Sequence, residues 1–139
     1  MLMRVLIAGL AGMLLQPLVF AQTAVSDLEA RGLKPLSEAE LRALLPGNTL
    51  YHVNAAKGIK VPLFYAQGGK RYVRLRGEVL ESAWRIEGDG VCEYSVVLKR
   101  DVCRSLYRFE GGGAVCDAGR PVCDYGLEWA AGNPEGLGQ

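Results

Sequence analysis

Arginines recur at alternate positions in one short segment, Tyr72-Val73-Arg74-Leu75-Arg76. In a β-strand, alternation places Tyr72, Arg74 and Arg76 on one face, with neighbouring arginines about 6.6–6.8 Å apart. Guanidinium groups bind carboxylates and phosphates through paired hydrogen bonds, so the segment predicts an anion-binding stripe. The alternative is a solvated strand face whose arginines pair with carboxylates across the sheet, which is the more common arrangement. Further cations at the margin of the stripe are Lys60, Lys70 and Arg71, and the carboxylates available for pairing are Glu78, Glu81, Glu87 and Glu93.

Four cysteines lie in the last third of the chain: Cys92, Cys103, Cys116 and Cys123. Four cysteines allow three pairings, and we favour Cys92–Cys103 and Cys116–Cys123 because each pair brackets a candidate hairpin. Residues 97–100 lie near the midpoint of the first pair, and residues 118–121 supply glycine and proline for a turn in the second. The sequence itself leaves the other two pairings open. A redox or metal site is the alternative, but the chain has no CxxC spacing and no histidine near the cysteines.

The single histidine, His52, is a candidate general base, yet its neighbours Tyr51 and Val53 favour a structural position in a strand. The acidic residues Asp117, Asp124 and Glu128 offer oxygen ligands without the spacing of a calcium-binding loop. The sequence therefore predicts no catalytic residue, no metal site and no cofactor. We therefore expect that the protein is not an enzyme.

The composition limits the class of protein. The chain has 139 residues, 16 Lys and Arg against 15 Asp and Glu, and 50% apolar residues. That length suits one domain, and the apolar content argues against intrinsic disorder. A net charge near zero gives no electrostatic reason to expect binding to nucleic acid.

The first residues are typical of a secretory signal peptide. Arg4 supplies a positive start, Val5 to Leu15 form an apolar run, and Val19-Phe20-Ala21 suits signal peptidase. Cleavage after Ala21 is the expected event, with Ala24 as the second choice. An uncleaved anchor is the alternative, but the apolar run is short for a membrane span, which needs roughly 20 residues. We expect a periplasmic or secreted protein without a stable membrane anchor, divided into a signal peptide (1–21) and a single disulfide-bonded β domain (22–139).

One helix has clear boundaries. Ser37 and Glu40 have the spacing of a capping box, Leu36 and Leu41 that of a hydrophobic staple, and Pro46 follows the last apolar residue. These signals predict a helix over residues 37–45. Residues 25–31 are a weaker candidate for a second short helix.

The remainder of the chain has the pattern of short strands separated by turn residues. Pro62 indicates an edge position or a strand start, and Gly111 to Gly113 indicate a flexible turn. Seven or eight such strands predict a mainly β fold, an antiparallel barrel or strongly curled sheet. Whether the barrel is filled or encloses a pocket lined by aromatic residues stays open. The predicted strands are 49–54, 61–67, 70–80, 83–86, 91–98, 103–109, 114–116 and 122–129.

The chain resembles a loose group of small secreted proteobacterial proteins that are classed as domains of unknown function. The resemblance rests on Leu44-Leu45-Pro46-Gly47-Asn48-Thr49 after a short helix, Phe64-Tyr65 before a glycine turn, Trp84 before Gly88-Asp89, Cys92 and Cys103 around a hairpin, Tyr107, and the ending Gly132-Asn133-Pro134-Glu135-Gly136-Leu137. It implies a fold and a compartment and transfers no catalytic residue. Cys116 and Cys123 are an addition to that pattern.

Two functions fit these observations. The first is an exported binding module, without catalysis, that recognises an anionic or amphipathic partner: an unidentified protein or a small ligand in the cell envelope. The second is a protein inhibitor of an exported hydrolase, for which the turn at residues 118–121 is the candidate contact loop. The inhibitor hypothesis rests on an analogy of fold alone.

Overall fold

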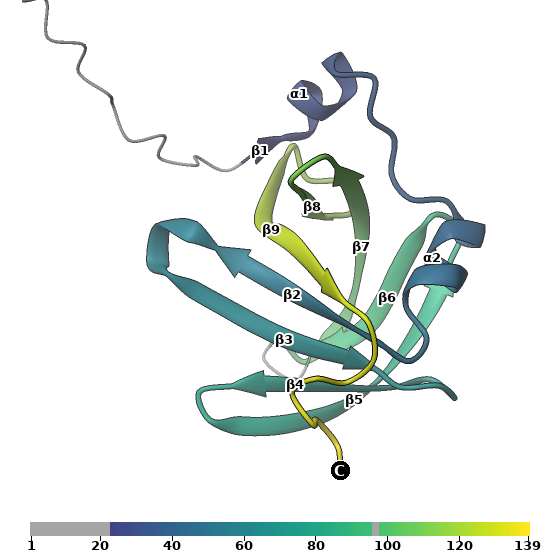
Figure 1. The fold of residues 1–139 in the computed structure, drawn as a ribbon. Helices are drawn as coiled ribbons and strands as arrows, with labels where there is room; N and C mark the ends of the chain where they lie inside the picture. Colours follow the sequence, from purple (N-terminus) through teal and green to yellow (C-terminus); the bar gives the residue numbers. More distant parts are fainter. Residues whose placement is uncertain (1–22, 96–97) are drawn as a thin grey trace, which may run out of the picture.

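The computed structural model describes residues 23–95 and 98–139. The expected signal peptide lies outside these residues, as do Val96 and Val97 of the strand predicted over 91–98. The elements shown in Figure 1 are β1 (Thr23–Ala24), α1 (Val25–Ala30), α2 (Glu38–Leu44), β2 (Asn48–Asn54), the 3-10 turn η1 (Ala55–Lys57), β3 (Ile59–Tyr65), β4 (Lys70–Leu75), β5 (Glu78–Glu87), β6 (Gly90–Ser95), β7 (Arg100–Phe109), β8 (Gly112–Asp117) and β9 (Val122–Ala130).

Strands β2 to β9 form a closed antiparallel barrel. Each strand pairs with the next along the chain, and β9 pairs with both β8 and β2, which closes the sheet. The short strand β1 adds to β9. Closure removes the unpaired edges that an open sheet would present. The prediction of a mainly β barrel with one or two short helices is confirmed.

Two local predictions were wrong, and both errors concern turns. Residues 70–80 are not one strand, because Arg76 and Gly77 adopt positive φ angles (51° and 79°) and form a hairpin turn between β4 and β5. Gly113 lies in β8 rather than in a glycine turn. A Cβ atom at Gly113 would collide with the carbonyl oxygen of Tyr107 and lie 3.0 Å from Cβ of Leu127, so the glycine permits close packing of strands.

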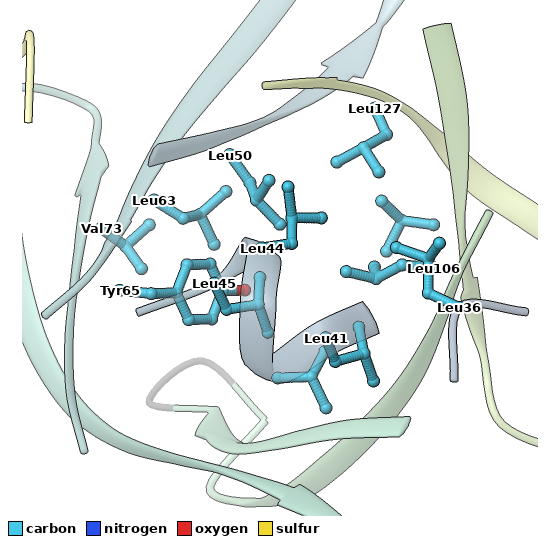
Figure 2. Close-up of a cluster of buried hydrophobic side chains, with 12 residues drawn as sticks. Leu36, Leu41, Leu44, Leu45, Leu50, Leu63, Tyr65, Val73, Leu106 and Leu127 are labelled. Atoms are coloured by element: carbon cyan, nitrogen blue, oxygen red, sulfur yellow. The ribbon is translucent and has the colours of Figure 1, made fainter. Parts of the chain in front are cut away.

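Helix α2 covers one end of the barrel, which we call the closed end. The capping box is present: Glu40 N–H donates to Ser37 Oγ, and Ser37 N–H donates to Glu40 Oε1, both at 3.2 Å. Leucines from α2 enter the barrel and meet inward-facing side chains of β2, β3, β4, β7 and β9 (Figure 2). The buried members of this core are Leu36, Leu41, Leu44, Leu45, Leu50, Leu63, Tyr65, Val73, Val91, Leu106, Val115 and Leu127.

A second, smaller core lies outside the barrel wall. Leu28 of α1 is fully buried against Tyr107 of β7 and Ala114 of β8. The disulfide Cys116–Cys123 belongs to the same cluster. The other disulfide, Cys92–Cys103, joins directly opposed residues of β6 and β7. Both pairings are the ones favoured from the hairpin pattern.

The ladder between β3 and β4 is short. Among the described residues the two strands pair from Leu63 to Tyr65, so residues 59–62 of β3 have no partner on the β4 side. Pro62, which has no N–H to donate, lies in this unpaired stretch within β3. The predicted edge position of Pro62 therefore exists locally, inside a closed barrel.

Candidate functional site

The barrel interior widens away from α2 into a cavity of about 900 Å³. Its mouth lies at the tips of the β2–β3, β4–β5 and β6–β7 hairpins, where Lys57, Arg76 and Leu98 line it; we call this the open end. In Figure 1 the β2–β3 and β4–β5 tips lie on the side away from α2. The walls are largely apolar and include Val61, Leu63, Val73, Leu75, Leu80 and the ring of Tyr125.

Three charged side chains meet inside the barrel and line the cavity. Arg71 Nη1 pairs with Glu93 Oε2, and Arg104 Nη1 pairs with Glu93 Oε1, so one carboxylate joins two guanidinium groups. The side chains of Arg71 and Glu93 are 7% and 3% exposed, and that of Arg104 is 16% exposed. Buried charges at this depth require such pairing, because an isolated one would be strongly destabilising.

Further hydrogen bonds fix the orientation of both arginines. Arg71 Nε donates to Ser82 Oγ at 3.2 Å, and Arg104 Nε donates to Asp117 Oδ1 at 3.1 Å. Arg71 also forms a side-chain hydrogen bond with Tyr65. A guanidinium group has five N–H donors, which is more than the three partners named for Arg71 or the two named for Arg104.

His52 of β2 lies beside this cluster and is also buried. Its ring stacks on Tyr125 of β9, with centroids 5.3 Å apart. Burial lowers the pKa of His52 to about 3, with further lowering by the charges of Arg104 and Arg71. A histidine with this pKa is neutral at pH 7 and is a weak base, which agrees with the structural position favoured from its neighbours.

The charge of the cavity lining differs from that of the whole chain. Two carboxylates line the cavity, Glu78 and Glu93, whereas the chain as a whole has nearly equal numbers of acids and bases. A surplus of one sign in a partly enclosed, largely apolar space attracts the opposite charge. Six cationic residues border the same space: Lys57, Lys60, Arg71, Arg74, Arg76 and Arg104. Two of them, Lys60 and Arg74, pair with Glu128 and Glu135 on the outer face, so the surplus is smaller than this number suggests.

The predicted anion stripe is divided between two locations. Tyr72 and Arg74 lie on the outer face of β4, since Val73 between them is in the barrel core. Arg76 lies in the turn after β4. Arg71, named above as a margin of the stripe, points to the opposite face and into the barrel. Anion binding by Tyr72, Arg74 and Arg76 stays a prediction.

The segment after β9, residues 131–139, covers much of that outer face; we call it the C-terminal segment. Arg74 Nη1 donates to Glu135 Oε2 at 3.0 Å, and the hydroxyl of Tyr51 donates to Glu135 Oε1 at 3.1 Å. Gly138 lies so close to the ring of Tyr72 that a Cβ atom there would be 2.7 Å from it. Glu135 thus links β2 to β4 across β3, and Figure 1 shows the segment running past β3 and β4.

The acidic residues considered as cation ligands have other partners. Asp117 binds Arg104 and Arg120, Asp124 binds Arg120 at 2.7 Å, and Glu128 binds Lys60 at 2.5 Å. Arg120 therefore pairs with carboxylates that flank its own turn. This turn is the loop named in the inhibitor hypothesis, which stays untested.

A cluster of potential metal-ligand atoms occurs at Glu87, Cys92 and Cys103. The two cysteines form a disulfide and so offer no thiolate to a metal ion.

The polar residues inside the barrel could have been recognised from the sequence, because they lie in phase with the apolar residues of their strands. Arg71 is in phase with Val73 and Leu75, and Arg104 is in phase with Val102 and Leu106. A charged residue that replaces an apolar one at the alternating positions of a strand points to the core face. The same reasoning applies to Glu93, two residues after Val91, and to His52, two residues after Leu50.

No family model, curated protein or solved structure matches the chain. The resemblance to secreted proteins of unknown function stays a prediction. Across residues 23–95 and 98–139, no helix has the length and apolar character needed to cross a membrane.

Proposed function

We propose that this protein is an exported binding protein for small amphipathic anions, which it holds inside the barrel without catalysing a reaction. The observation that carries the proposal is the cavity of about 900 Å³, with apolar walls and two arginines, Arg71 buried and Arg104 partly buried, beside one carboxylate. Its volume is within the range of about 300–1,000 Å³ that is usual for small-molecule sites.

The acidic group of the ligand binds Arg71 and Arg104. Both guanidinium groups are held by other side chains and have more N–H donors than these partners, so little ordering is needed when an oxyanion arrives. Glu93 opposes the anion electrostatically and limits its affinity, while it keeps the empty site stable.

The apolar part of the ligand lies along the walls towards the mouth. Val61, Leu75 and Leu80 are only partly buried in the empty protein, so a hydrocarbon chain there would remove apolar surface from water. The unpaired stretch of β3 at Pro62 also lines the cavity. The cavity therefore borders the gap between β3 and β4 as well as the open end.

The two disulfides indicate an oxidising, extracytoplasmic environment. Export through a cleaved signal peptide at residues 1–21 is part of the proposal, and it agrees with the disulfides.

Calorimetric titration of three decyl probes tests the ligand class. Decanoate, decanol and decyltrimethylammonium share an apolar chain and differ in the charge of the head group. We expect decanoate to bind at least tenfold more tightly than decanol and the cation not to bind, because hydrogen bonds to charged groups contribute about 1.5–3 kcal/mol. Equal binding of all three probes would overturn the role of the arginines.

Two substitutions in the cavity give effects of opposite sign. Arg71→Met removes donors and lowers the affinity for decanoate by about tenfold, whereas Glu93→Gln removes the opposing charge and raises it by about tenfold. Arg85→Met, on the outer face of β5, is the matched control and leaves the affinity unchanged. Near-UV circular dichroism verifies that each variant is folded. Equal losses for Arg71→Met and Arg85→Met would contradict the proposal.

A further inference from the structure

The tips of the hairpins at the open end have an unusual surface. Ile59 after the β2–β3 turn is 47% exposed, Val79 at the start of β5 is 48% exposed, and Leu98 at the β6–β7 turn is 51% exposed. Ala55 and Ala56 of η1 are also exposed beside them. Exposed apolar residues that cluster at one end of a molecule indicate an interaction surface.

The same tips are cationic. Lys57, Arg76, Lys99 and Arg100 are exposed there, and among the described residues none of the four forms an ion pair with a carboxylate. The carboxylates next to these cations in the chain are Glu78, the first residue of β5, and Asp101, which follows Arg100 and pairs with Arg85. At the opposite end, the region around α2 contains both signs of charge, with Glu38, Glu40, Asp89 and Glu110 alongside Lys34, Arg42 and Arg108.

We propose that the open end docks on the surface of an anionic lipid bilayer. A surface that alternates basic residues with short apolar side chains fits this partner, since the cations attract anionic head groups and the apolar side chains enter the interface. The β2–β3 and β4–β5 turns are short and joined to a closed barrel, so their side chains reach the bilayer without rearrangement of the fold. Docking in this orientation turns the mouth of the cavity towards the lipid.

This inference does not depend on the ligand proposed above. The docking residues are at the hairpin tips, whereas the anion of the ligand is assigned to Arg71 and Arg104 inside the barrel. A variant altered at Lys99 and Arg100, neither of which lines the cavity, keeps its affinity for decanoate within about twofold. A variant altered at Arg71 keeps its affinity for vesicles, so the failure of one proposal is distinguishable from the failure of the other.

Sedimentation with lipid vesicles tests the docking surface, with the protein in the processed form that its host produces. Vesicles of phosphatidylcholine with one-third phosphatidylglycerol are compared with vesicles of phosphatidylcholine alone. We expect at least tenfold stronger binding to the anionic vesicles, and a loss of that preference in high salt. Equal binding to both vesicle types, or no binding, would overturn the proposal.

Two matched double substitutions locate the surface. Lys99→Glu with Arg100→Glu changes the charge at the open end at two exposed residues that do not line the cavity, and Lys34→Glu with Arg108→Glu makes the same change of charge near α2. We expect the first pair to lower binding to anionic vesicles at least tenfold and the second to lower it less than threefold. Equal effects would mean that overall charge, and not this surface, governs the binding, which would refute the inference.

Discussion

The two halves of the barrel are held together by different means. Strands β6 to β9 contain both disulfides, have long ladders from β6 to β7 and from β7 to β8, and are covered outside by α1. Strands β2 to β5 have no disulfide, contain the short β3–β4 ladder and are covered outside by the C-terminal segment. Most of the cavity wall comes from strands β2 to β5.

The contrast indicates how a small barrel combines a rigid frame with an accessible interior. Covalent bonds and a second core stabilise one wall, so the other wall can leave part of a strand unpaired and enclose a cavity. The buried ion pairs join the halves, because Arg71 lies in β4 while Glu93 and Arg104 lie in β6 and β7.

The largest effect is expected from Glu93→Ala, which breaks the contact between the halves. It leaves two buried arginines without their common partner, so the free energy of unfolding falls by roughly 3–5 kcal/mol. Urea unfolding measures this change. Glu81→Ala is the control, because Glu81 pairs with Lys70 on an exposed face and its loss changes stability by less than about 1 kcal/mol. Similar values for the two variants would show that the ion pairs do not join the halves.

Loss of a disulfide has the next largest expected effect on the free energy of unfolding, and it acts within strands β6 to β9. Replacing Cys116 and Cys123 together by alanine lowers the free energy of unfolding by roughly 2–4 kcal/mol, as does replacing Cys92 and Cys103. Hydrogen exchange locates the effect. In the intact protein we expect faster exchange in β3 and β4 than in β7 and β8, and a smaller difference in either double variant. Equal exchange rates in the intact protein would remove the distinction between the halves.

Acid unfolding tests the contact of His52 in β2 with Tyr125 in β9. The pKa of His52 is about 3 in the folded protein and about 6.5 when unfolded. Between these values the unfolded chain binds a proton that the folded one does not, so stability falls as the pH falls. The loss between pH 6.5 and 5 is about 2 kcal/mol.

The matched variant for this test is His52→Phe, which keeps an aromatic ring against Tyr125. It lacks the titrating group, so its stability falls less steeply between pH 6.5 and 5 than that of the original protein, while the carboxylates contribute equally to both. The charges of Arg104 and Arg71 contribute to the low pKa of His52. Parallel curves would contradict the burial of a neutral histidine.

The smallest effect is expected from Glu135→Gln, which weakens the attachment of the C-terminal segment to β2 and β4. Arg74 and Glu135 are 39% and 35% exposed, so solvent screens the pair and the loss is below about 1 kcal/mol. The hydrogen bond from Tyr51 can persist to the amide oxygen. A fall in the free energy of unfolding above about 2 kcal/mol would mean that the C-terminal segment is a main support of strands β2 to β5.

Features that depend on neighbours in the sequence were predictable. The capping box at Ser37 and Glu40 and the two hairpin disulfides involve residues close together in the chain, so their spacing carries the information. Features that depend on distant strands were not. Tyr51 and Arg74 both reach Glu135, which follows them by 84 and 61 residues, and no local pattern indicates that contact.

The candidate site was missed for a related reason. Alternation in β4 separates the two faces correctly up to Leu75, but it directs attention to the arginines of the polar face, whose anion binding stays a prediction. Arg71 belongs to the apolar face of β4. It becomes a candidate site residue because it shares the carboxylate of Glu93 with Arg104, a residue 33 positions later in the chain. These two residues meet at Glu93 because the curled sheet brings together the inner faces of β4, β6 and β7.

The order of the cysteines in the chain bears on how the protein acquires its bonds. Both disulfides join consecutive cysteines, with 11 and 7 residues of separation. A chain that emerges from a translocation channel with its N-terminus first presents Cys92 and Cys103 before Cys116 and Cys123. Each cysteine then meets its correct partner as the next one to appear, so oxidation in order of emergence produces the native pairing without later exchange of disulfides.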